Sequence, residues 1–374
     1  MQLLRIDCLG KELRLEASMA GWQALYWDNQ LVSQISANAD ACESFEHSFT
    51  LQAQSEAMAE AIVEPIVEPR QITCTLKLKL NWQPFALSYC LEVDQQLLAE
   101  GELTEQDIES QEVVNRVKQP RKFSILGLGS LALKLFKSAK VVKVLFAAGS
   151  LAAYTWLFSI EFAIALILCL VFHEYGHIRA MKRFGLKTKG IYLIPFVGGL
   201  AVSDDRINTR WQNVYISIMG PCYGLFLSIV CLVLYWITDI ELLAGLAAFN
   251  ALLNLFNMLP VLPLDGGHVL KSISFSVNSV VGLLFCVVCA IAGVAVSYTF
   301  GLALLGFLLA IGSIEILFEW KRRHHSDLLP LDRYGQIVSG CWYFATVGGL
   351  SWIIWHLGQG ENSALALPLR ILAS

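Results

Sequence analysis

Seven long apolar runs limit what this chain can fold into more than any other feature of its sequence. A helix of about 20 apolar residues spans the hydrocarbon core of a membrane. The runs cover residues 144–160, 162–181, 211–237, 242–259, 278–297, 300–319 and 337–356. Of the 374 residues, 56% are hydrophobic and 16% are charged, which is more apolar than soluble domains usually are. The sequence therefore predicts a membrane all-α region of about seven transmembrane helices.

The charges between the runs predict how these helices are oriented. Basic residues fill the connection after the second run (182–210) and the one after the sixth (321–323), whereas the alternate connections carry acidic residues or no charge. Cytoplasmic loops of membrane proteins are enriched in Lys and Arg. We therefore expect a multi-pass protein of a prokaryotic cytoplasmic membrane, with its N-terminus in the cytoplasm.

The first 118 residues read as a separate acidic, β-rich domain. Residues 1–120 contain 8 Lys and Arg against 19 Asp and Glu. In 71–81 (QITCTLKLKLN), apolar and polar residues alternate, as in a half-buried strand, and Asp28-Asn29 suits a tight hairpin turn. The beginning of the chain lacks an apolar signal-peptide core, so we expect this domain to be cytoplasmic with reduced cysteines. The prediction is a small β-sandwich of six to eight strands.

A linker, the transmembrane domain and a tail complete the predicted domain organisation. Residues 119–143 form a basic linker and an interfacial helix, because Lys134, Lys137, Lys140 and Lys143 recur every three residues and could contact an anionic membrane face. Residues 144–357 form the transmembrane domain, and 358–374 form a C-terminal tail. The adjacent His324 and His325 lie beside two arginines, so we expect a solvated cytoplasmic loop there rather than a second metal site.

The second apolar run contains the motif His-Glu-x-x-His, in FHEYGH. His173 and His177 are four residues apart, so on a helix both imidazoles face the same way and can bind one metal ion. Glu174 faces away from that pair, where it can take a proton from a metal-bound water. Because polar residues inside a spanning helix are costly, their presence here favours a functional site.

A catalytic zinc site usually has a third protein ligand, and several residues could supply it. The candidates are His47, His268, His324, His325, His356, Asp265, Glu315 and Glu319. Asp265 stands out because it follows the fourth run in FNMLPVLPLDGGHVL, where prolines and glycines force an irregular backbone. Irregular backbone at membrane depth is buried in protein or lines a water-filled cavity. The alternative role for Asp265 is the N-cap of a helix that begins near Gly266.

Together, His173-Glu174-x-x-His177 and Asn257-x-x-Pro-x-x-Pro-x-Asp265-Gly resemble the site-2 protease family of intramembrane zinc metalloproteases, over roughly residues 140–280. This resemblance implies one Zn²⁺ ion held by His173, His177 and Asp265, with Glu174 as the base that activates a zinc-bound water. It also implies that Asn257 binds the scissile peptide.

The stretch IYLIPFVGGLAV resembles the membrane-embedded β-hairpin of the same family, and an extended substrate could pair with its edge near Gly198 and Gly199. MGPCYG, with Gly220 and Gly224, resembles a family motif that we expect to shape helix packing. Gly176, in the zinc-binding motif, could let another helix pack closely.

These features predict an intramembrane zinc metalloendopeptidase that cleaves in or near a transmembrane segment of a membrane-protein substrate. The expected partners are that substrate, the lipid bilayer and a soluble or membrane partner bound through the N-terminal domain, with no nucleic acid. One alternative is a zinc-binding membrane protein without peptidase activity, acting as a chaperone or retention factor. Another is a metal transporter, which would need polar residues across spans that have almost none.

Overall fold

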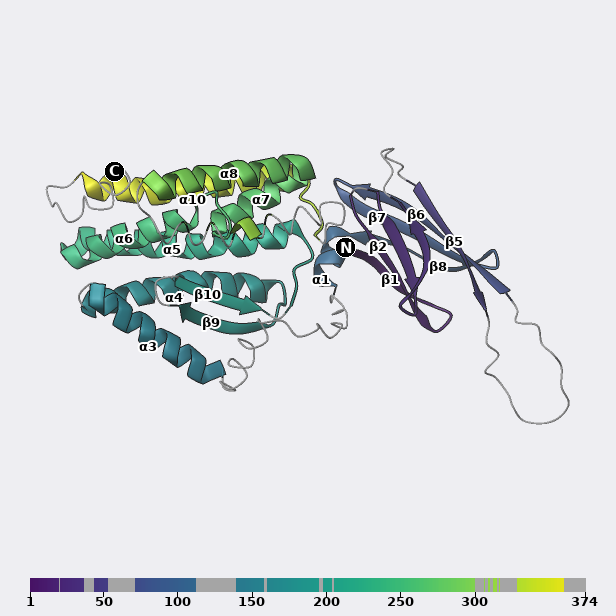
Figure 1. The fold of residues 1–374 in the computed structure, drawn as a ribbon, viewed down its shortest axis with the longest axis horizontal. Helices are drawn as coiled ribbons and strands as arrows, with labels where there is room; N and C mark the ends of the chain where they lie inside the picture. The colour runs from purple at the N-terminus through teal and green to yellow at the C-terminus, as the bar shows by residue number, and fades with distance from the viewer. Residues whose placement is uncertain are drawn as a thin grey trace. The chain divides into compact units, whose positions relative to one another are not determined.

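The computed structural model contains two compact units, and each is described by itself (Figure 1). One unit consists of residues 1–111 with 321–333, and the other of residues 112–320 with 334–374. The structure describes residues 1–19, 21–36, 44–52, 71–111, 139–157, 160–194, 198–203, 205–299, 306, 309, 312–314, 316 and 328–359.

The first unit is a sandwich of two four-stranded antiparallel sheets that share one core, which confirms the antiparallel β-structure predicted for the N-terminal part of the chain. In both sheets the strand order follows the sequence, so that each sheet is a simple meander. One sheet consists of β1 (Gln2–Cys8), β2 (Lys11–Ala17), β3 (Gln23–Trp27) and β4 (Gln30–Ile35). The other consists of β5 (Ser44–Gln52), β6 (Gln71–Trp82), β7 (Phe85–Val93) and β8 (Gln96–Thr104), and helix α1 (Glu105–Ser110) follows it.

The local sequence explains these strands. In β6, Cys74, Leu76, Leu78 and Leu80 are buried while the residues between them are more accessible, as the alternation predicts. The connection from β3 to β4 is the two-residue turn Asp28-Asn29, and both residues have positive φ angles, of 50° and 62°. Such turns match the right-handed twist of the paired strands. The predicted hairpin is therefore confirmed.

The core of the sandwich includes one side chain from far along the sequence. Leu329 is fully buried in a cluster that otherwise consists of residues of the β-strands and α1, and Gln83 Nε2 donates a hydrogen bond to the Leu331 carbonyl oxygen (3.2 Å). The sequence analysis predicted a solvated loop around His324 and His325. Those two histidines lie outside the described residues, but the chain that follows them is not solvated at Leu329 and Leu331, because both side chains are buried.

One buried polar side chain links the two sheets of the sandwich. His47 on β5 has no exposed surface, and its Nδ1 lies 2.9 Å from Ser33 Oγ on β4. Its Nε2 lies 2.9 Å from Gln23 Oε1 on β3. Because an amide oxygen only accepts, His47 Nε2–H donates to Gln23 and Nδ1 accepts from the Ser33 hydroxyl. Both ring nitrogens are thus satisfied in the neutral imidazole.

The second unit is helical. Its helices with complete bounds are α3 (Ala139–Leu157), α4 (Ile160–Arg183), α5 (Arg210–Thr238), α6 (Glu241–Asn257), α7 (Asp265–Val277), α8 (Ser279–Thr299) and α10 (Arg333–Gly358). Between α4 and α5 lies an antiparallel hairpin of β9 (Thr188–Ile194) and β10 (Gly198–Ser203), which pairs Gly198 with Ile194 and Gly199 with Leu193. The hairpin predicted from the sequence is therefore present, and α3 and α4 both contact it.

Four helices within the described residues are long and apolar enough to cross a membrane: 163–183, 210–238, 280–299 and 333–358. The predicted count of seven is not reached among these residues. The run 242–259 corresponds to α6, an apolar helix of 17 residues, and the run 144–160 corresponds largely to α3. Most of the run 300–319, of the linker 119–143 and of the tail 358–374 lies outside the described residues.

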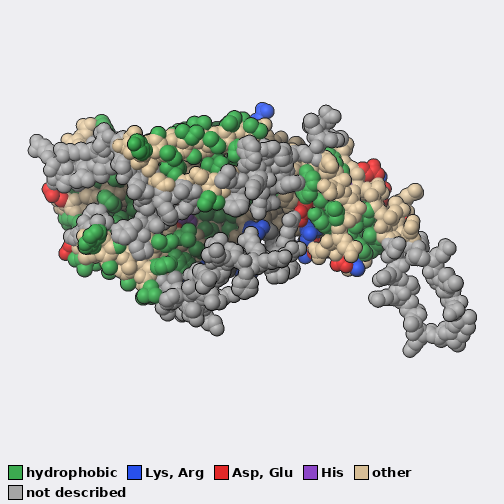
Figure 2. Space-filling model, viewed as in Figure 1, with side chains coloured by type: hydrophobic (Ala, Val, Ile, Leu, Met, Phe, Trp, Pro, Cys, Tyr) green, Lys and Arg blue, Asp and Glu red, His purple; other side chains and the backbone are tan. Residues whose placement is uncertain are grey.

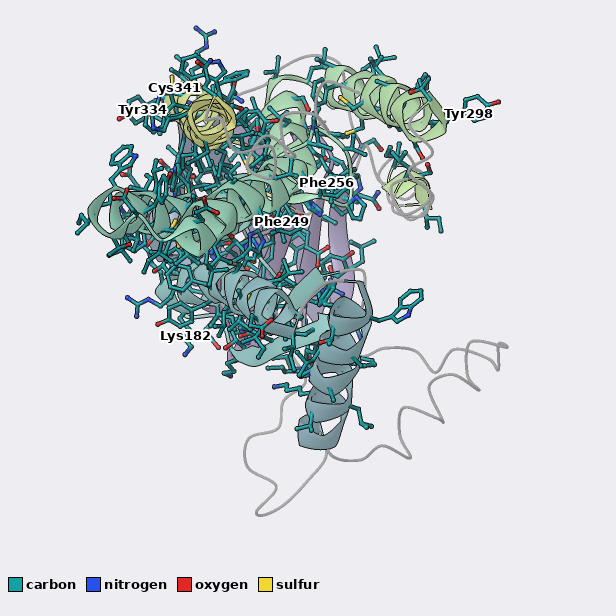
Figure 3. All side chains as sticks on the ribbon, turned by 90° about the vertical axis from the view of Figure 1, so that its left-hand side faces the viewer. Lys182, Phe249, Phe256, Tyr298, Tyr334 and Cys341 are labelled. Atoms are coloured by element: carbon teal, nitrogen blue, oxygen red, sulfur yellow. The ribbon has the colours of Figure 1, made fainter. Side chains whose placement is uncertain are left out.

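Large apolar side chains cover much of the described surface of the helical unit (Figure 2). Trp156 and Tyr298 are 82% and 89% exposed, and Figure 3 shows Tyr298 pointing away from the helices. Inside the unit, α4 and α5 approach closely, since a Cβ on Gly176 would collide with the Met219 carbonyl oxygen. The expectation that Gly176 lets another helix pack closely is therefore confirmed.

Candidate metal centre

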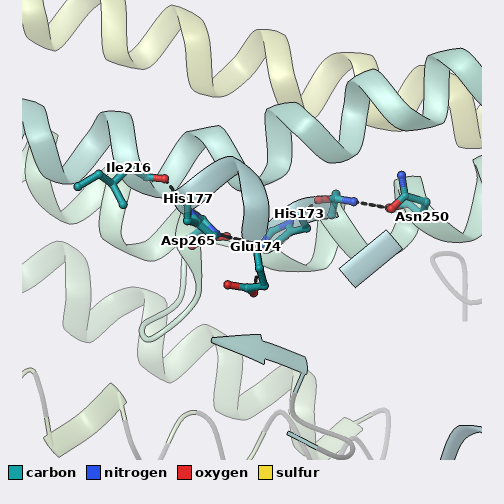
Figure 4. A network of polar contacts seen from close by, with 7 residues as sticks. His173, Glu174, His177, Ile216, Asn250 and Asp265 are labelled. Carbon is teal, nitrogen blue, oxygen red and sulfur yellow. Dashed lines mark hydrogen bonds and ion pairs between the residues drawn. The ribbon is translucent and has the colours of Figure 1, made fainter. Parts of the chain in front are cut away.

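Two histidines of α4 and one aspartate of α7 form a compact group of metal-ligand atoms (Figure 4). His173 Nε2 lies 3.3 Å from Asp265 Oδ2, and His177 Nε2 lies 3.4 Å from the same oxygen. The two Nε2 atoms are 3.1 Å apart. The two histidines are buried and Asp265 is partly buried. This is the one group of its kind in the described part of the chain.

The secondary structure explains how three residues from distant parts of the sequence converge. His173 and His177 are one helical turn apart, so their side chains lie on the same face of α4. Asp265 is the first residue of α7, and the N-cap is Leu264. The alternative role of Asp265 as an N-cap is therefore wrong, because its carboxylate is directed at the histidines. As expected, the segment before it is buried, with Met258, Val261, Leu262 and Leu264 inaccessible.

Small residues and one tyrosine hold this irregular segment against α7. A Cβ on Gly266 would collide with the Met258 carbonyl oxygen. A Cβ on Gly267 would lie 2.6 Å from the Val261 carbonyl oxygen. Tyr343, on α10, donates a hydrogen bond from its hydroxyl to the same Met258 carbonyl (2.6 Å). The two glycines that follow Asp265 are thus required by close backbone contacts at the beginning of α7.

A chain of amide hydrogen bonds fixes the orientation of the His173 ring. Asn254 Nδ2–H donates to the Asn250 carbonyl oxygen (2.8 Å), and since a carbonyl only accepts, Asn254 Oδ1 must face the other way. That oxygen lies 2.7 Å from His173 Nδ1 and accepts its proton. Nε2 is then unprotonated and presents a lone pair to the group's centre, as metal ligation requires.

The second histidine is oriented in the same way by the backbone. His177 Nδ1–H donates to the Ile216 carbonyl oxygen on α5 (2.7 Å), which leaves Nε2 free to bind a metal. The chain of amides also extends further from the centre. Asn250 Nδ2–H donates to the Gly224 carbonyl oxygen and to Ser228 Oγ, both at 2.8 Å. Both imidazoles are thus held as metal-binding tautomers by elements other than their own helix.

Glycines give the reactive side chains their space. A Cβ on Gly220 would collide with His177 Nε2 and approach His173 Nε2 within 2.9 Å, so α5 can pass beside the group only with glycine there. A Cβ on Gly199 of β10 would collide with the side chain of Glu174. Glu174 is 5% exposed, and its Oε1 lies 4.0 Å from His173 Nε2. The hairpin and the carboxylate are therefore in direct contact.

Two imidazole nitrogens and one carboxylate oxygen are a donor set typical of catalytic zinc sites with three protein ligands. The hydrogen bonds to both Nδ1 atoms and the separations of 3.1, 3.3 and 3.4 Å between the three ligand atoms fit a bound metal ion. His173, His177 and Asp265 are the residues that could hold it. The two histidines of the centre lie on a helix whose residues 163–183 could span a membrane.

The other residues that the sequence analysis proposed for the site, Asn257 and Gly198, are not part of the group of metal-ligand atoms. Asn257 is the last residue of α6, one turn after Asn254, and its side chain makes no hydrogen bond within the described part of the chain. Gly198 pairs with Ile194 in the hairpin. The sequence analysis missed Asn254 and Asn250, although two asparagines four residues apart in an apolar helix are costly and indicate polar partners.

Comparison with known proteins identifies relatives of this chain. Residues 161–240 match the model of Peptidase family M50. A zinc metalloprotease of Methanocaldococcus jannaschii is 35% identical over 115 residues, which make up 29% of this chain and 33% of that protein. Stage IV sporulation protein FB of Bacillus subtilis is 28% identical over 184 residues, or 46% of this chain and 63% of that protein.

A further relative, from Synechocystis sp., is 30% identical over 203 residues, which make up 52% of this chain and 48% of that protein. The chain thus spans between about a third and two thirds of the length of these three relatives.

Proposed function

We propose that this chain, a homologue of the zinc metalloproteases of peptidase family M50, is an intramembrane zinc metalloendopeptidase. It would hydrolyse a peptide bond in or near a transmembrane segment of a membrane-protein substrate. One observation carries the proposal: His173, Glu174 and His177 lie on a helix long and apolar enough to span a membrane, and Asp265 of α7 completes the group of metal-ligand atoms beside them. A metal centre at that depth suits a substrate bond that also lies in the membrane.

The chemistry assigns a role to each residue. One Zn²⁺ ion, when bound by His173, His177 and Asp265, would act as a Lewis acid and lower the pKa of a coordinated water. Glu174 is the general base: its carboxylate takes a proton from the attacking water and returns it to the leaving amide nitrogen. The carbon–oxygen bond forms first, and the carbon–nitrogen bond breaks once its nitrogen has received the proton. The products are a carboxylate and an amine.

Substrate binding is assigned to the residues that flank Glu174. Within the described residues, β10 pairs with β9 along one edge only, so its other edge offers backbone groups to an extended peptide. The contact between Gly199 and Glu174 supports this position, because a strand paired there would pass close to the base. Asn257 would bind the scissile peptide through its amide. The substrate must unwind locally first, since a helix keeps its peptide bonds in hydrogen bonds.

The membrane setting follows from the same residues. Lys182 and Arg183 end α4 on the side that the positive-inside rule assigns to the cytoplasm of a prokaryotic cell. The N-terminal sandwich would then be cytoplasmic, where it could present a substrate or bind a soluble or membrane partner. A variant lacking residues 1–118 should lose substrate selection under this proposal. If this variant selects the same substrates as the full-length protein, the sandwich does not present substrates and has another role.

Glu174→Gln tests the proposed function directly. In membranes of cells that carry the full-length protein, mapping of new protein N-termini should find fragments that end within or beside a transmembrane helix. Replacement of the general base should reduce these fragments at least about 100-fold. Purified Glu174→Gln protein should keep its zinc, whereas His177→Ala, the matched control, should lose it. Equal fragments from wild type and a zinc-loaded Glu174→Gln protein would disprove the peptidase and favour a zinc-binding protein with another role.

A further inference from the structure

A hollow of about 420 Å³ lies between the last turns of α4 and the first half of α5. Three cations from α4, Arg179, Lys182 and Arg183, line one side of it. They are three and four residues apart, so they lie on one face of the helix. All three are exposed, and Figure 3 shows Lys182 on the outer side of α4. The side chains that line the hollow include no carboxylate.

Aromatic rings hold one of these cations in place and leave the other two free. The Arg183 guanidinium lies 5.2 Å from the centroid of the Tyr215 ring, and its Nη1–H donates to the Tyr215 hydroxyl (3.1 Å). Tyr215 is itself in edge contact with Trp342 of α10 (5.5 Å between centroids). The side chains of Arg179 and Lys182 make no hydrogen bond or ion pair within the described residues. Among the described residues, two positive charges are thus unpaired beside an aromatic wall.

The opposite wall of the hollow is aromatic and apolar. Tyr215, Met219 and Tyr223 line the hollow from α5. They follow each other at intervals of four residues and extend over about 12 Å of helix. The Tyr223 ring contacts Tyr175 of α4, with 5.9 Å between centroids. The hollow is therefore cationic at the end of α4 and aromatic and apolar further into the two spanning helices.

We propose that this hollow binds an anionic phospholipid, with its phosphate between Arg179, Lys182 and Arg183 and an acyl chain along Met219 and Tyr223. The order of chemistry along the hollow matches that of a phospholipid, with charge at the membrane surface and hydrocarbon below it. A free phosphate would use only the cationic end.

The position suggests what such a lipid does for the protein. The same stretch of α5 that lines the hollow at Met219 continues into Gly220, which packs against the two histidines on its other side. Gly176 of α4 contacts the Met219 backbone. A lipid seated between α4 and α5 therefore stabilises the helix pair on which the metal centre is built.

Retention of lipid by the purified full-length protein tests this proposal without any assay of proteolysis. The probes are phosphatidylglycerol and phosphatidylcholine, added to delipidated protein and measured by native mass spectrometry. Wild type should retain phosphatidylglycerol preferentially. Arg179→Gln/Lys182→Gln should weaken this retention by about tenfold or more. The matched control, Lys187→Gln/Arg206→Gln, removes two exposed charges outside the hollow and should retain phosphatidylglycerol as wild type does.

Three outcomes would overturn the proposal: equal retention of both lipids, equal losses in the two double variants, or displacement of the lipid by excess inorganic phosphate. Displacement by phosphate would show that the three cations bind a free anion rather than a lipid. Met219→Trp keeps every charge but fills the apolar part of the hollow, so it provides a second test if the first double variant does not fold. It should also lower retention, and unchanged retention would contradict the assigned path of the acyl chain.

Discussion

The β-sandwich and the helical unit differ in how many polar side chains they bury. In the sandwich, the largest fully buried side chains are almost all leucines: Leu3, Leu4, Leu13, Leu15, Leu25, Leu76, Leu87 and Leu91, together with Ile108. In the helical unit, many buried side chains are polar or charged: His173, Glu174, His177, Arg210, Ser228, Asn250, Asn254, Lys271, Ser272 and Ser276. Its exposed surface is rich in Val, Leu, Ile, Phe and Trp.

This difference shows how the surrounding solvent determines which residues a protein can place inside. In water, folding gains free energy by removing apolar surface, so the sandwich hides its leucines. Lipid solvates apolar side chains as well as a protein core does, so the outer faces of the helices can be apolar. Polar groups in lipid need partners, and α4 to α7 supply them to one another around the metal centre. The single buried histidine of the sandwich follows the same rule on a smaller scale.

The largest expected effect comes from placing the same charge on the two surfaces. Phe226 on α5 and Leu97 on β8 are 60% and 57% exposed. Phe226→Lys should cost about 2.5–3.5 kcal/mol, because a lysine near the middle of a spanning helix must leave water. Leu97→Lys should change stability by less than about 0.5 kcal/mol. Recovery of full-length protein in the membrane fraction, with its thermal stability in detergent, measures both, and equal effects would refute the assigned lipid-facing surface.

A smaller effect is expected inside the helical unit, where one polar partner supports the metal centre. Asn254→Leu removes the acceptor of the His173 Nδ1 proton and should weaken zinc binding about 10- to 100-fold. Asn254→Asp keeps an acceptor and should restore most of the affinity. Asn257→Leu, one turn away, should leave zinc affinity unchanged. Competition with a chelator measures all three, and normal affinity in Asn254→Leu would show that Asn254 does not orient the ligand.

The smallest expected effect concerns the buried polar group of the sandwich. Burial lowers the pKa of His47 from its ordinary value of 6.5, so the unfolded state binds a proton more readily than the folded state. Neutral His47 therefore contributes its full stability above pH 6.5, the ordinary pKa that applies in the unfolded state. This stability is lost as the pH falls through the lower pKa of the folded state. His47→Gln should remove this loss.

Hydrogen exchange of β5 in the full-length protein tests the effect, with both proteins compared at each pH. Exchange in wild type should accelerate relative to His47→Gln as pH falls from about 7.5 to 5.5. A constant ratio of the two rates would contradict a buried neutral histidine. Burial, with the nearby carboxylates of Glu109 and Asp332, raises the pKa of Glu105 to about 7, which acts in the opposite direction. Because Glu105 is present in both proteins, its effect cancels in the ratio.

The sequence predicted those features that depend on neighbouring residues or on regular spacing. Alternation in 71–81 identified a strand with one buried face, and the Asp28-Asn29 turn identified a hairpin. The four-residue interval between His173 and His177 is enough to place two imidazoles on one side of a helix. Proline and glycine around Asp265 correctly indicated a buried, irregular segment. In each case the physical constraint acts within a few residues, so it can be read along the chain.

Other features required the tertiary structure, because they join residues that no local spacing connects. Nothing beside Leu329 indicates that its side chain completes a core formed by residues 1–111. Asn254 orients His173 only because α6 packs against α4, and Gly220 is needed only because α5 passes the two histidines at backbone distance. The sequence by itself thus determined which residues could bind a metal ion and that they lie among membrane-spanning segments. The packing of the helices decided which partners fix those residues, because hydrogen bonds and close contacts between elements depend on their positions in space.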